Sequence, residues 1–294
     1  MNYTEFVDVI FGVVKKEIPA GISVKKTEVV KNNGLRRTGL SFYEEGLNAA
    51  PTLYLEGFFE HFNLGTSMED IAEMVLCSYF KTRLKNKIDV GFFMNYEEAR
   101  ETIFCKLINY ELNKELLASV PYVRFLDLAI VSYCRLDKGF HGEASILIRN
   151  EHLLKWGIDS ATLFKDARDN TRYKMNYSIR NITTILKDFA PQEDIADSLM
   201  DAEVPMYVLT NKQNYYGAVY MIFDDILKEF CEMFDGDLCV IPSSVHETII
   251  VPDREAAFMC VDEMIKEVNN EHVEEEERLS DHAYHYRREG GFLI

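Results

Sequence analysis

Apolar and polar positions recur along this chain with two periods, which predict amphipathic helices and short strands. In the first 90 residues, a helical period over 4–18 has Thr4 as its expected N-cap, and two strand-like runs flank an Asn-Asn-Gly turn at 32–34. A further helix is expected to begin at Ser67, with Asp70 three positions later in a variant of the capping box. This part should therefore form a helix, a hairpin and then more helices.

The middle of the chain carries the plainest hairpin pattern. Strand-like residues over 122–136 and 144–150 are separated by the glycine-containing turn DKGFHGE. Upstream, the pattern over 96–119 predicts either a helix or a helix followed by a strand. The second alternative would give the hairpin a further neighbour.

A helical period follows this hairpin over 151–171 and is expected to break at Gly157, with Asp159 or Ser160 capping its second part. The next stretch mixes charge with few strand formers. It is predicted to be a connection between two halves, at 171–204.

Beyond residue 204 the predicted order is two strands and a helix, repeated once. Strands are expected over 206–210, 215–221, 237–241 and 247–252, and helices over 224–234 and 254–272. Short turns make such strands antiparallel, and the two helices are expected to cover one face of the sheet. The fold class is therefore predicted to be α+β, with an N-terminal lobe at 1–170, a connecting helical segment at 171–204 and a C-terminal lobe at 205–294.

Composition narrows the class of protein. Apolar residues make up 47% of the chain and charged residues 28%, as in ordinary folded proteins. The formal charge of −17 repels nucleic-acid phosphates and anionic lipid, so neither nucleic acid nor a membrane is an expected partner. A basic strip, consisting of Lys81, Arg83, Lys85 and Lys87, is expected to be the solvated end of a helix, with nucleic-acid contact as the alternative.

The six cysteines are scattered, most of them in apolar runs, and no CxxC pair occurs. This pattern favours buried, reduced thiols in a cytoplasmic protein over a zinc site or a disulfide framework. The N-terminal apolar run has no cationic region before it, and no stretch approaches the roughly 18 apolar residues of a membrane span. We expect a cytoplasmic protein with no metal and no cofactor.

The segment DLCVIPSSVHETIIVPD is the stretch that most resembles a catalytic site, because serine, histidine and glutamate lie close together between two strand-like runs. If 245–251 is a strand, neighbouring side chains project to opposite faces, so His246 and Glu247 point apart and a local triad fails. We expect a polar bend in which the hydroxyls of Ser243 and Ser244 bond to nearby backbone groups. Such a bend could still contact a ligand.

An enzymatic alternative remains open for the same segment. A hydrolase or transferase could use Ser244 and His246 with an acid from a distant segment, Asp281 or Asp225. The chain contains no GxSxG elbow.

The turn LTNKQNYYGA is the second candidate, because asparagine side chains stabilise turns and glycine often marks a close backbone approach. This turn and the serine-containing bend both follow the first strand of a predicted hairpin, so we expect them at the same edge of the sheet. The predicted ligand-binding residues are Asn211, Asn214, Tyr216, Gly217, Ser243, Ser244 and His246.

Three other patterns have simpler explanations. The acidic face of 224–234 could bind a metal ion, but an acidic helix usually faces water. His282, Tyr284 and Tyr286 share one face of a predicted last strand, where aromatic cross-strand packing is expected. The charged run at 274–278 is expected to be a solvated linker.

Four stretches together resemble a family of unknown function that is common in anaerobic Firmicutes of the gut, above all Clostridia. They are IRNEHLLKWGIDSATLFKDARDNT, MYVLTNKQNYYGAVYM, VIPSSVHETIIVP and VNNEHVEEEERLSDHAYHYRR, all in the last two-thirds of the chain. The resemblance implies a cytoplasmic bacterial protein, often encoded in mobile or accessory gene neighbourhoods. It implies no activity and supplies no catalytic residue.

The leading hypothesis is a non-enzymatic binding or regulatory protein, whose unknown protein or small-molecule ligand contacts the 209–217 turn and the 242–247 bend. It rests on the lack of a phosphate loop, a dinucleotide fingerprint, a zinc pair and a nucleophile elbow in the sequence. The hydrolase or transferase is the second hypothesis. The third is a homodimer joined at an edge strand.

Overall fold

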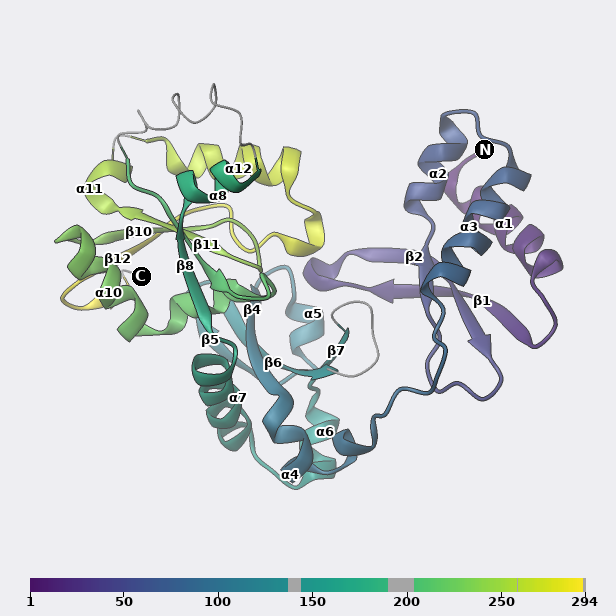
Figure 1. The fold of residues 1–294 in the computed structure, drawn as a ribbon, viewed down its shortest axis with the longest axis horizontal. Helices are drawn as coiled ribbons and strands as arrows, with labels where there is room; N and C mark the ends of the chain where they lie inside the picture. The colour runs from purple at the N-terminus through teal and green to yellow at the C-terminus, as the bar shows by residue number, and fades with distance from the viewer. Residues whose placement is uncertain (137–143, 190–203, 258, 293–294) are drawn as a thin grey trace. The chain divides into compact units, whose positions relative to one another are not determined.

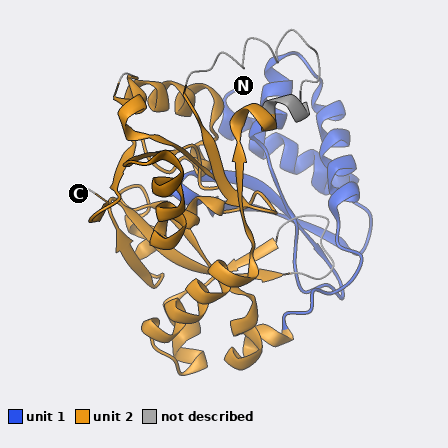
Figure 2. Ribbon diagram, turned by 60° about the vertical axis from the view of Figure 1, so that its left-hand side comes forward, with its two compact units in different colours: residues 1–90 blue, residues 91–294 orange. Residues whose placement is uncertain are grey.

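A computed structural model describes residues 1–136, 144–189, 204–257 and 259–292 (Figure 1). These residues form an α+β protein, as predicted, and their strands make three antiparallel sheets. The chain divides at Val90 into two compact units (Figure 2). The sequence instead predicts lobes at 1–170 and 205–294, and residues 190–203 of its predicted connection lie outside the described residues.

The first unit holds one sheet and its own core. Its elements are α1 (Tyr3–Glu17), β1 (Ile22–Val30), η1 (Asn32–Gly34), β2 (Arg36–Glu44), β3 (Thr52–Tyr54), α2 (Glu56–Asn63) and α3 (Met68–Thr82). The strands lie in the order β1-β2-β3, and the predicted turn at 32–34 joins the first two. Phe42 and Tyr79 stack in the core with ring centroids 4.2 Å apart and planes at 15°.

Two helix starts in this unit test the predicted caps. Asn2, not Thr4, caps α1, because the Asn2 side chain accepts from the Glu5 amide while the Glu5 carboxylate accepts from the Asn2 amide. Ser67 caps α3 as predicted, accepting from the Asp70 amide at 3.1 Å.

The second unit begins with a four-stranded sheet and its helices. The elements are η2 (Gly91–Met94), α4 (Tyr96–Ala99), η3 (Arg100–Thr102), β4 (Ile103–Asn109), α5 (Lys114–Leu117), β5 (Tyr122–Phe125), β6 (Leu128–Leu136), β7 (Ala144–Leu147), α6 (Asn150–Trp156) and α7 (Ser160–Lys174). Strand β6 is central: β4 pairs along one edge, and β5 and β7 pair with successive halves of the other. The predicted turn DKGFHGE lies outside the described residues.

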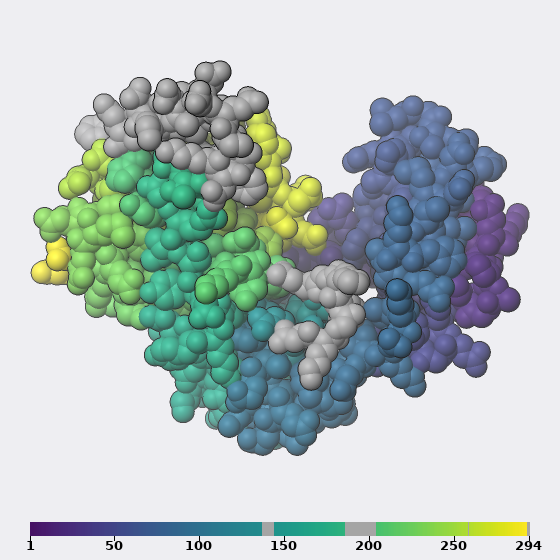
Figure 3. Space-filling model, viewed as in Figure 1, coloured from purple at the N-terminus to yellow at the C-terminus, as the bar shows by residue number. Residues whose placement is uncertain are grey.

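The helix break predicted at Gly157 is confirmed. Gly157 ends α6 with a left-handed φ of 67°, and the Asp159 side chain caps α7 by accepting from the Thr162 amide. Helix α7 packs against β4 and lies at the surface of the second unit (Figure 3).

A six-stranded sheet completes the second unit. Its elements are β8 (Tyr177–Asn181), α8 (Ile182–Phe189), β9 (Tyr207–Asn211), η4 (Gly217–Ile222), α10 (Asp224–Phe234), β10 (Leu238–Pro242), β11 (Thr248–Pro252), α11 (Asp253–Ala256), α12 (Val261–His272), η5 (Glu275–Glu277), β12 (Tyr284–Arg287) and β13 (Gly291–Phe292). The strand order is β13-β12-β10-β11-β9-β8. Its core is continuous with that of the four-stranded sheet.

Three predicted elements in this region are wrong. The single helix expected over 254–272 is divided into α11 and α12, since Cys260 precedes α12 as its N-cap. Residues 177–181 were expected to belong to the connection, but they form β8, which pairs with β9. Residues 215–221 were expected to be a strand, but 217–222 form the 3-10 helix η4, whose first five residues are all buried. An apolar run that is buried all round has no polar alternation to distinguish a strand from a helix.

The helices cover both faces of the six-stranded sheet, not one face as predicted. Val240 packs in the same cluster as Phe230 of α10, whereas Ile241, the next residue of β10, packs with Ile265 of α12. All five residues of β10 are buried, as a strand covered on both sides requires. In the part of the chain that the structure describes, no helix is long and apolar enough to cross a membrane.

Candidate functional site

The turn after β9 and the bend before β11 lie at the same edge of the six-stranded sheet. Strands β9 and β11 pair antiparallel, with Leu209 opposite Thr248, so the end of one strand lies beside the start of the other. The predicted meeting of the two loops is therefore confirmed. Its cause is different, since β9 pairs with β11 and not with a strand of its own hairpin.

The turn is built around the buried side chain of Asn211. Its Nδ2 donates to the Tyr215 carbonyl at 2.7 Å, and its Oδ1 accepts from the Gln213 amide at 3.0 Å and from the Tyr215 amide at 3.3 Å. Asn214 and Tyr216 are both left-handed, with φ of 53°. Left-handed backbone is costly for a bulky side chain, so the surroundings of Tyr216 must stabilise it.

Gly217 allows the turn to approach the bend closely. A Cβ atom at this position would lie 2.3 Å from Thr210 Oγ1 and 2.6 Å from the His246 carbonyl oxygen. The Thr210 hydroxyl donates to that carbonyl at 2.8 Å. The close approach predicted for this glycine is therefore confirmed.

The imidazole of His246 fixes Tyr216. The Tyr216 amide donates to Nδ1 of His246 at 3.1 Å, and the two rings stack with centroids 5.5 Å apart and planes at 8°. Because Nδ1 accepts, a neutral ring carries its proton on Nε2, which lies 3.3 Å from Oε1 of Glu277. Both ring nitrogens are thus engaged with groups other than a serine.

The phenol ring of Tyr216 has neighbours on its other sides. Nζ of Lys106 lies 4.1 Å from the ring centroid, and Tyr133 meets the ring edge-on with centroids 5.1 Å apart. Burial, together with the neighbouring Tyr215, raises the pKa of the Tyr216 phenol. This residue is therefore neutral at physiological pH.

The serines serve the bend itself. Ser244 Oγ accepts from the His246 amide at 3.0 Å, and Ser243 Oγ donates to the Glu247 carboxylate at 3.4 Å. Residues 243–247 are not part of β11, so the strict alternation expected for 245–251 does not hold there. The predicted bond from a serine hydroxyl to the backbone is therefore confirmed for Ser244, whereas Ser243 bonds to a side-chain carboxylate instead.

The distant acids of the hydrolase alternative are engaged elsewhere. Asp225 accepts from Nε and Nη2 of Arg172 at 3.0 and 2.7 Å, and Asp281 accepts from Nδ2 of Asn269 at 2.8 Å. Neither acid is bonded to His246. The geometry therefore gives this alternative no support.

Sequence reasoning missed Glu277, Lys106 and Tyr133. Glu277 belongs to the charged run expected to be a solvated linker, yet its carboxylate lies beside His246 and its carbonyl accepts from the Val245 amide at 2.8 Å. Lys106 and Tyr133 reach the site from β4 and β6. Only the packing of one sheet against the other places them there, so no local signal could have found them.

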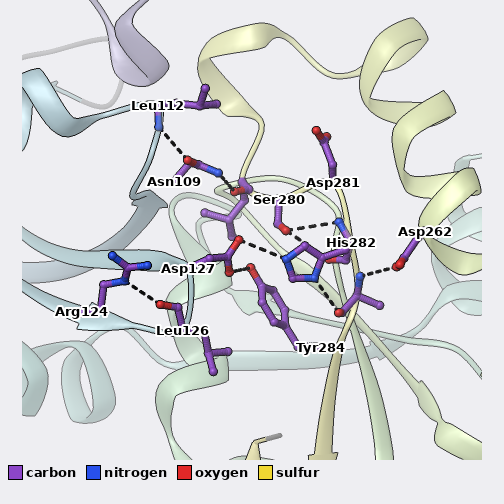
Figure 4. A network of polar contacts seen from close by, with 12 residues as sticks. Asn109, Leu112, Arg124, Leu126, Asp127, Asp262, Ser280, Asp281, His282 and Tyr284 are labelled. Atoms are coloured by element: carbon purple, nitrogen blue, oxygen red, sulfur yellow. Dashed lines mark hydrogen bonds and ion pairs between the residues drawn. The ribbon is translucent and has the colours of Figure 1, made fainter. Parts of the chain in front are cut away.

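A second polar cluster joins the two sheets (Figure 4). Asp127, in the turn between β5 and β6, accepts from the Tyr284 hydroxyl at 2.7 Å and lies 3.2 Å from Nε2 of His282. Tyr284 and Tyr286 are buried on one face of β12, as predicted, whereas His282 precedes that strand. His282 and Asp127 are 155 residues apart in the sequence, so no local pattern could predict this cluster.

A cavity of about 380 Å³ lies between α11, the start of α12 and β12. It is lined in part by Cys239, Cys260 and the His285–Asp253 pair, in which Nδ1 and Oδ1 are 2.5 Å apart. Burial, with Asp253 and Asp262 nearby, raises the pKa of the Cys239 thiol to about 12. This thiol is therefore protonated at neutral pH and is no nucleophile.

Among the residues that the structure describes, no group of three or more His, Cys, Asp or Glu side chains is arranged to hold a metal ion. Asp225, on the predicted acidic face of α10, bonds to Arg172 instead of facing only water. All six cysteines are free; Cys77 and Cys260 are exposed, and the other four are buried.

The fold and these contacts define a class of α+β protein in which two polar loops meet at one edge of a six-stranded antiparallel sheet. The chain belongs to a family of unknown function, DUF5688, whose family model matches residues 3–288. No curated protein and no solved structure matches the chain.

Proposed function

We propose that this chain is a non-enzymatic binding or regulatory protein of the bacterial cytoplasm, and that its ligand contacts the 211–217 turn and the 243–247 bend. The observation that carries the proposal is the double engagement of the His246 ring by the Tyr216 amide and the Glu277 carboxylate. A general base needs a free ring nitrogen directed at the proton that it removes. Here the imidazole has a positioning role.

Backbone strain supports a functional role for this turn. Two of its non-glycine residues, Asn214 and Tyr216, are left-handed. Such strain costs of the order of 1–3 kcal/mol per residue, and strained residues gather at active sites, ligand clamps and switch regions. The stack of Tyr216 on His246 holds the turn in that conformation.

The surface around the turn offers both stacking and hydrogen bonding. Lys212, Gln213 and Asn214 are exposed at its tip, and Tyr215 is half-buried, with its ring centroid 5.3 Å from that of His246. A tyrosine ring beside amide groups suits a planar ring with polar edges, carried by a small molecule or by a peptide. Nucleic acid is not the proposed ligand, given the charge of −17.

The test is an NMR titration of the ¹⁵N-labelled chain with a panel of nucleosides, aromatic amino acids and aromatic dipeptides. A ligand should shift the amide signals of 211–217 and 243–247, and Tyr215→Ala should weaken its binding at least about tenfold without lowering the melting temperature. Tyr173→Ala is the matched control, because Tyr173 is 75% exposed on α7.

Turnover would overturn the proposal. The same chain should be incubated with p-nitrophenyl esters, phosphoesters and nucleoside triphosphates. Hydrolysis that Ser244→Ala abolishes at an unchanged melting temperature would establish the enzymatic alternative instead. The third hypothesis, a homodimer joined at an edge strand, is tested separately by light scattering, which measures the mass of the particle in solution.

A further inference from the structure

The two ring nitrogens of His282 both face acceptors (Figure 4). Nδ1 lies 2.9 Å from the Ala283 carbonyl oxygen, and Nε2 lies 3.2 Å from Oδ2 of Asp127. A carbonyl and a carboxylate can only accept hydrogen bonds, and a neutral imidazole has one N–H to donate. Both contacts are satisfied together only when the ring carries two protons and a positive charge.

The partner carboxylate is held in place independently of the histidine. Asp127 sits in the tight β5–β6 turn next to Leu126, which is left-handed with φ of 57°. Its carbonyl accepts from the Tyr110 amide at 3.1 Å, and its Oδ1 accepts from the Tyr284 hydroxyl at 2.7 Å. These contacts orient the Asp127 carboxylate toward His282 whether or not the imidazole is charged.

The other charged groups around His282 favour the same state. Asp262 of α12 accepts from the Ala283 amide at 2.9 Å and adds negative charge, whereas Asp281 turns to Asn269. Arg124 of β5 donates to the Leu126 carbonyl. Burial disfavours a charged ring, but the bonds to Ala283 and Asp127 and the charge of Asp262 outweigh it, so the pKa of His282 lies above its ordinary value.

His282 also lies in a segment, 277–284, that runs from beside the 243–247 bend to the start of β12. Glu277 at its start binds the 243–247 bend, and the Leu279 carbonyl accepts from Nδ2 of Asn109 at 3.1 Å. Asn269 holds the Ser280 carbonyl at 3.0 Å. Contacts that do not involve His282 therefore hold the middle of the segment, while the His282–Asp127 ion pair and the Tyr284–Asp127 hydrogen bond together attach its end to the β5–β6 turn.

We propose that doubly protonated His282 is a pH-dependent clamp, which strengthens the attachment of the 277–284 segment to the β5–β6 turn and weakens it on deprotonation. Because the pKa is raised in the folded state, the contribution to stability is complete below about pH 6.5, the ordinary histidine value, and is lost as the pH rises through the folded-state pKa. Loss of the positive charge loosens the end of the segment that carries Glu277 and so reaches the 243–247 bend. The clamp does not depend on the ligand proposed above.

The test is an NMR pH titration of the full chain from pH 5 to 9. His282 should titrate above the ordinary histidine value of about 6.5, and the Val245 and Ala283 amide signals should shift with the same midpoint as His282. A His282 midpoint at or below about 6.5 would overturn the proposal without any variant. So would Val245 and Ala283 signals that do not follow His282.

Two variants separate the clamp from a general charge effect. Asp127→Asn should lower the His282 midpoint and expose the Arg278–Leu279 bond, giving at least about tenfold faster trypsin cleavage there at pH 7.5. Asp281→Asn removes the same charge one residue from His282 but keeps an acceptor for Asn269, so it should change neither readout. Equal effects of the two variants would reject the specific pair.

Discussion

The amide of Tyr216 donates to Nδ1 of His246 while the two rings stack almost in parallel. One imidazole therefore satisfies a backbone donor and covers an aromatic face of the same residue. This double contact stabilises a tyrosine in left-handed backbone, and it occupies Nδ1 of the histidine.

Replacing His246 should separate the two contacts. His246→Phe keeps a ring to stack but leaves the part-buried Tyr216 amide without its acceptor, at a cost of about 1–3 kcal/mol. His246→Asn restores an acceptor near the position of Nδ1 and loses the stack. Hydrogen exchange of the Tyr216 amide should be fast in the phenylalanine variant and slow in the asparagine variant. The reverse order would contradict the bond.

Gly217→Ala should destabilise the second unit by about 2 kcal/mol, because the new methyl group overlaps Thr210 Oγ1 and the His246 carbonyl. Gly236→Ala is the matched control: its Cβ would meet nothing nearer than the Phe234 carbonyl oxygen at 3.9 Å. Its effect should stay within about 0.5 kcal/mol. Urea denaturation measures both, and equal costs would show that the turn can move away from the bend.

Thiol reactivity should report burial directly. A disulfide reagent at pH 8 is expected to label Cys77 and Cys260 within seconds to minutes and the four buried cysteines only on unfolding. Burial raises the pKa of Cys231 to about 11 and that of Cys105 to about 12, so moving from pH 7 to pH 9 should leave both unreactive. Six labelled thiols in denaturant provide the control. Fast labelling of Cys239 would mean that the cavity admits the reagent to that thiol.

The division at Val90 predicts that residues 1–90 fold alone. This fragment contains its own sheet and core, so it should unfold cooperatively in urea. A fragment of residues 1–170 follows the sequence-based division and should expose apolar surface, because Tyr133 would lose the buried contacts supplied by η4 and β10. Cooperative unfolding of every residue in 1–170, measured by hydrogen exchange, would instead support the sequence-based lobe.

Within residues 1–90, Phe42→Ala should cost about 3–5 kcal/mol, since the ring is fully buried against Tyr79. The neighbouring Tyr43 is 43% exposed on the other face of β2, so Tyr43→Ala should cost far less. Urea midpoints of the two variants give the comparison. Similar costs would place the core of this unit elsewhere.

Local features of the fold could be predicted from the sequence because their causes are local. The Ser67 cap, the turn at 32–34 and the break at Gly157 each depend on side chains within a few residues. The sequence did not predict the type of element correctly where burial on all sides removes the periodicity of polar positions, as in η4. The prediction also failed for β8, because its residues are mostly half-buried and include polar and charged side chains that are uncommon in strands.

The residues of the candidate site likewise fall into those that the sequence could predict and those that it could not. Asn211, Gly217 and His246 were expected at one edge on the basis of two hairpins, but the second strand of the first hairpin does not form, and the pairing of β9 with β11 brings these residues together instead. Glu277 and Asp127 could not be predicted, since their positions depend on how segments more than 30 residues away pack. The assumed alternation failed over 245–247 because these residues belong to the bend and not to β11, which begins at Thr248.

Strand β12 borders β10, although more than 40 residues separate them along the chain. Without β12, β10 would have an unpaired edge on the side away from β11. An unpaired, fully apolar strand is a template for association with another chain. Residues 284–287 thus guard against aggregation as well as complete the sheet.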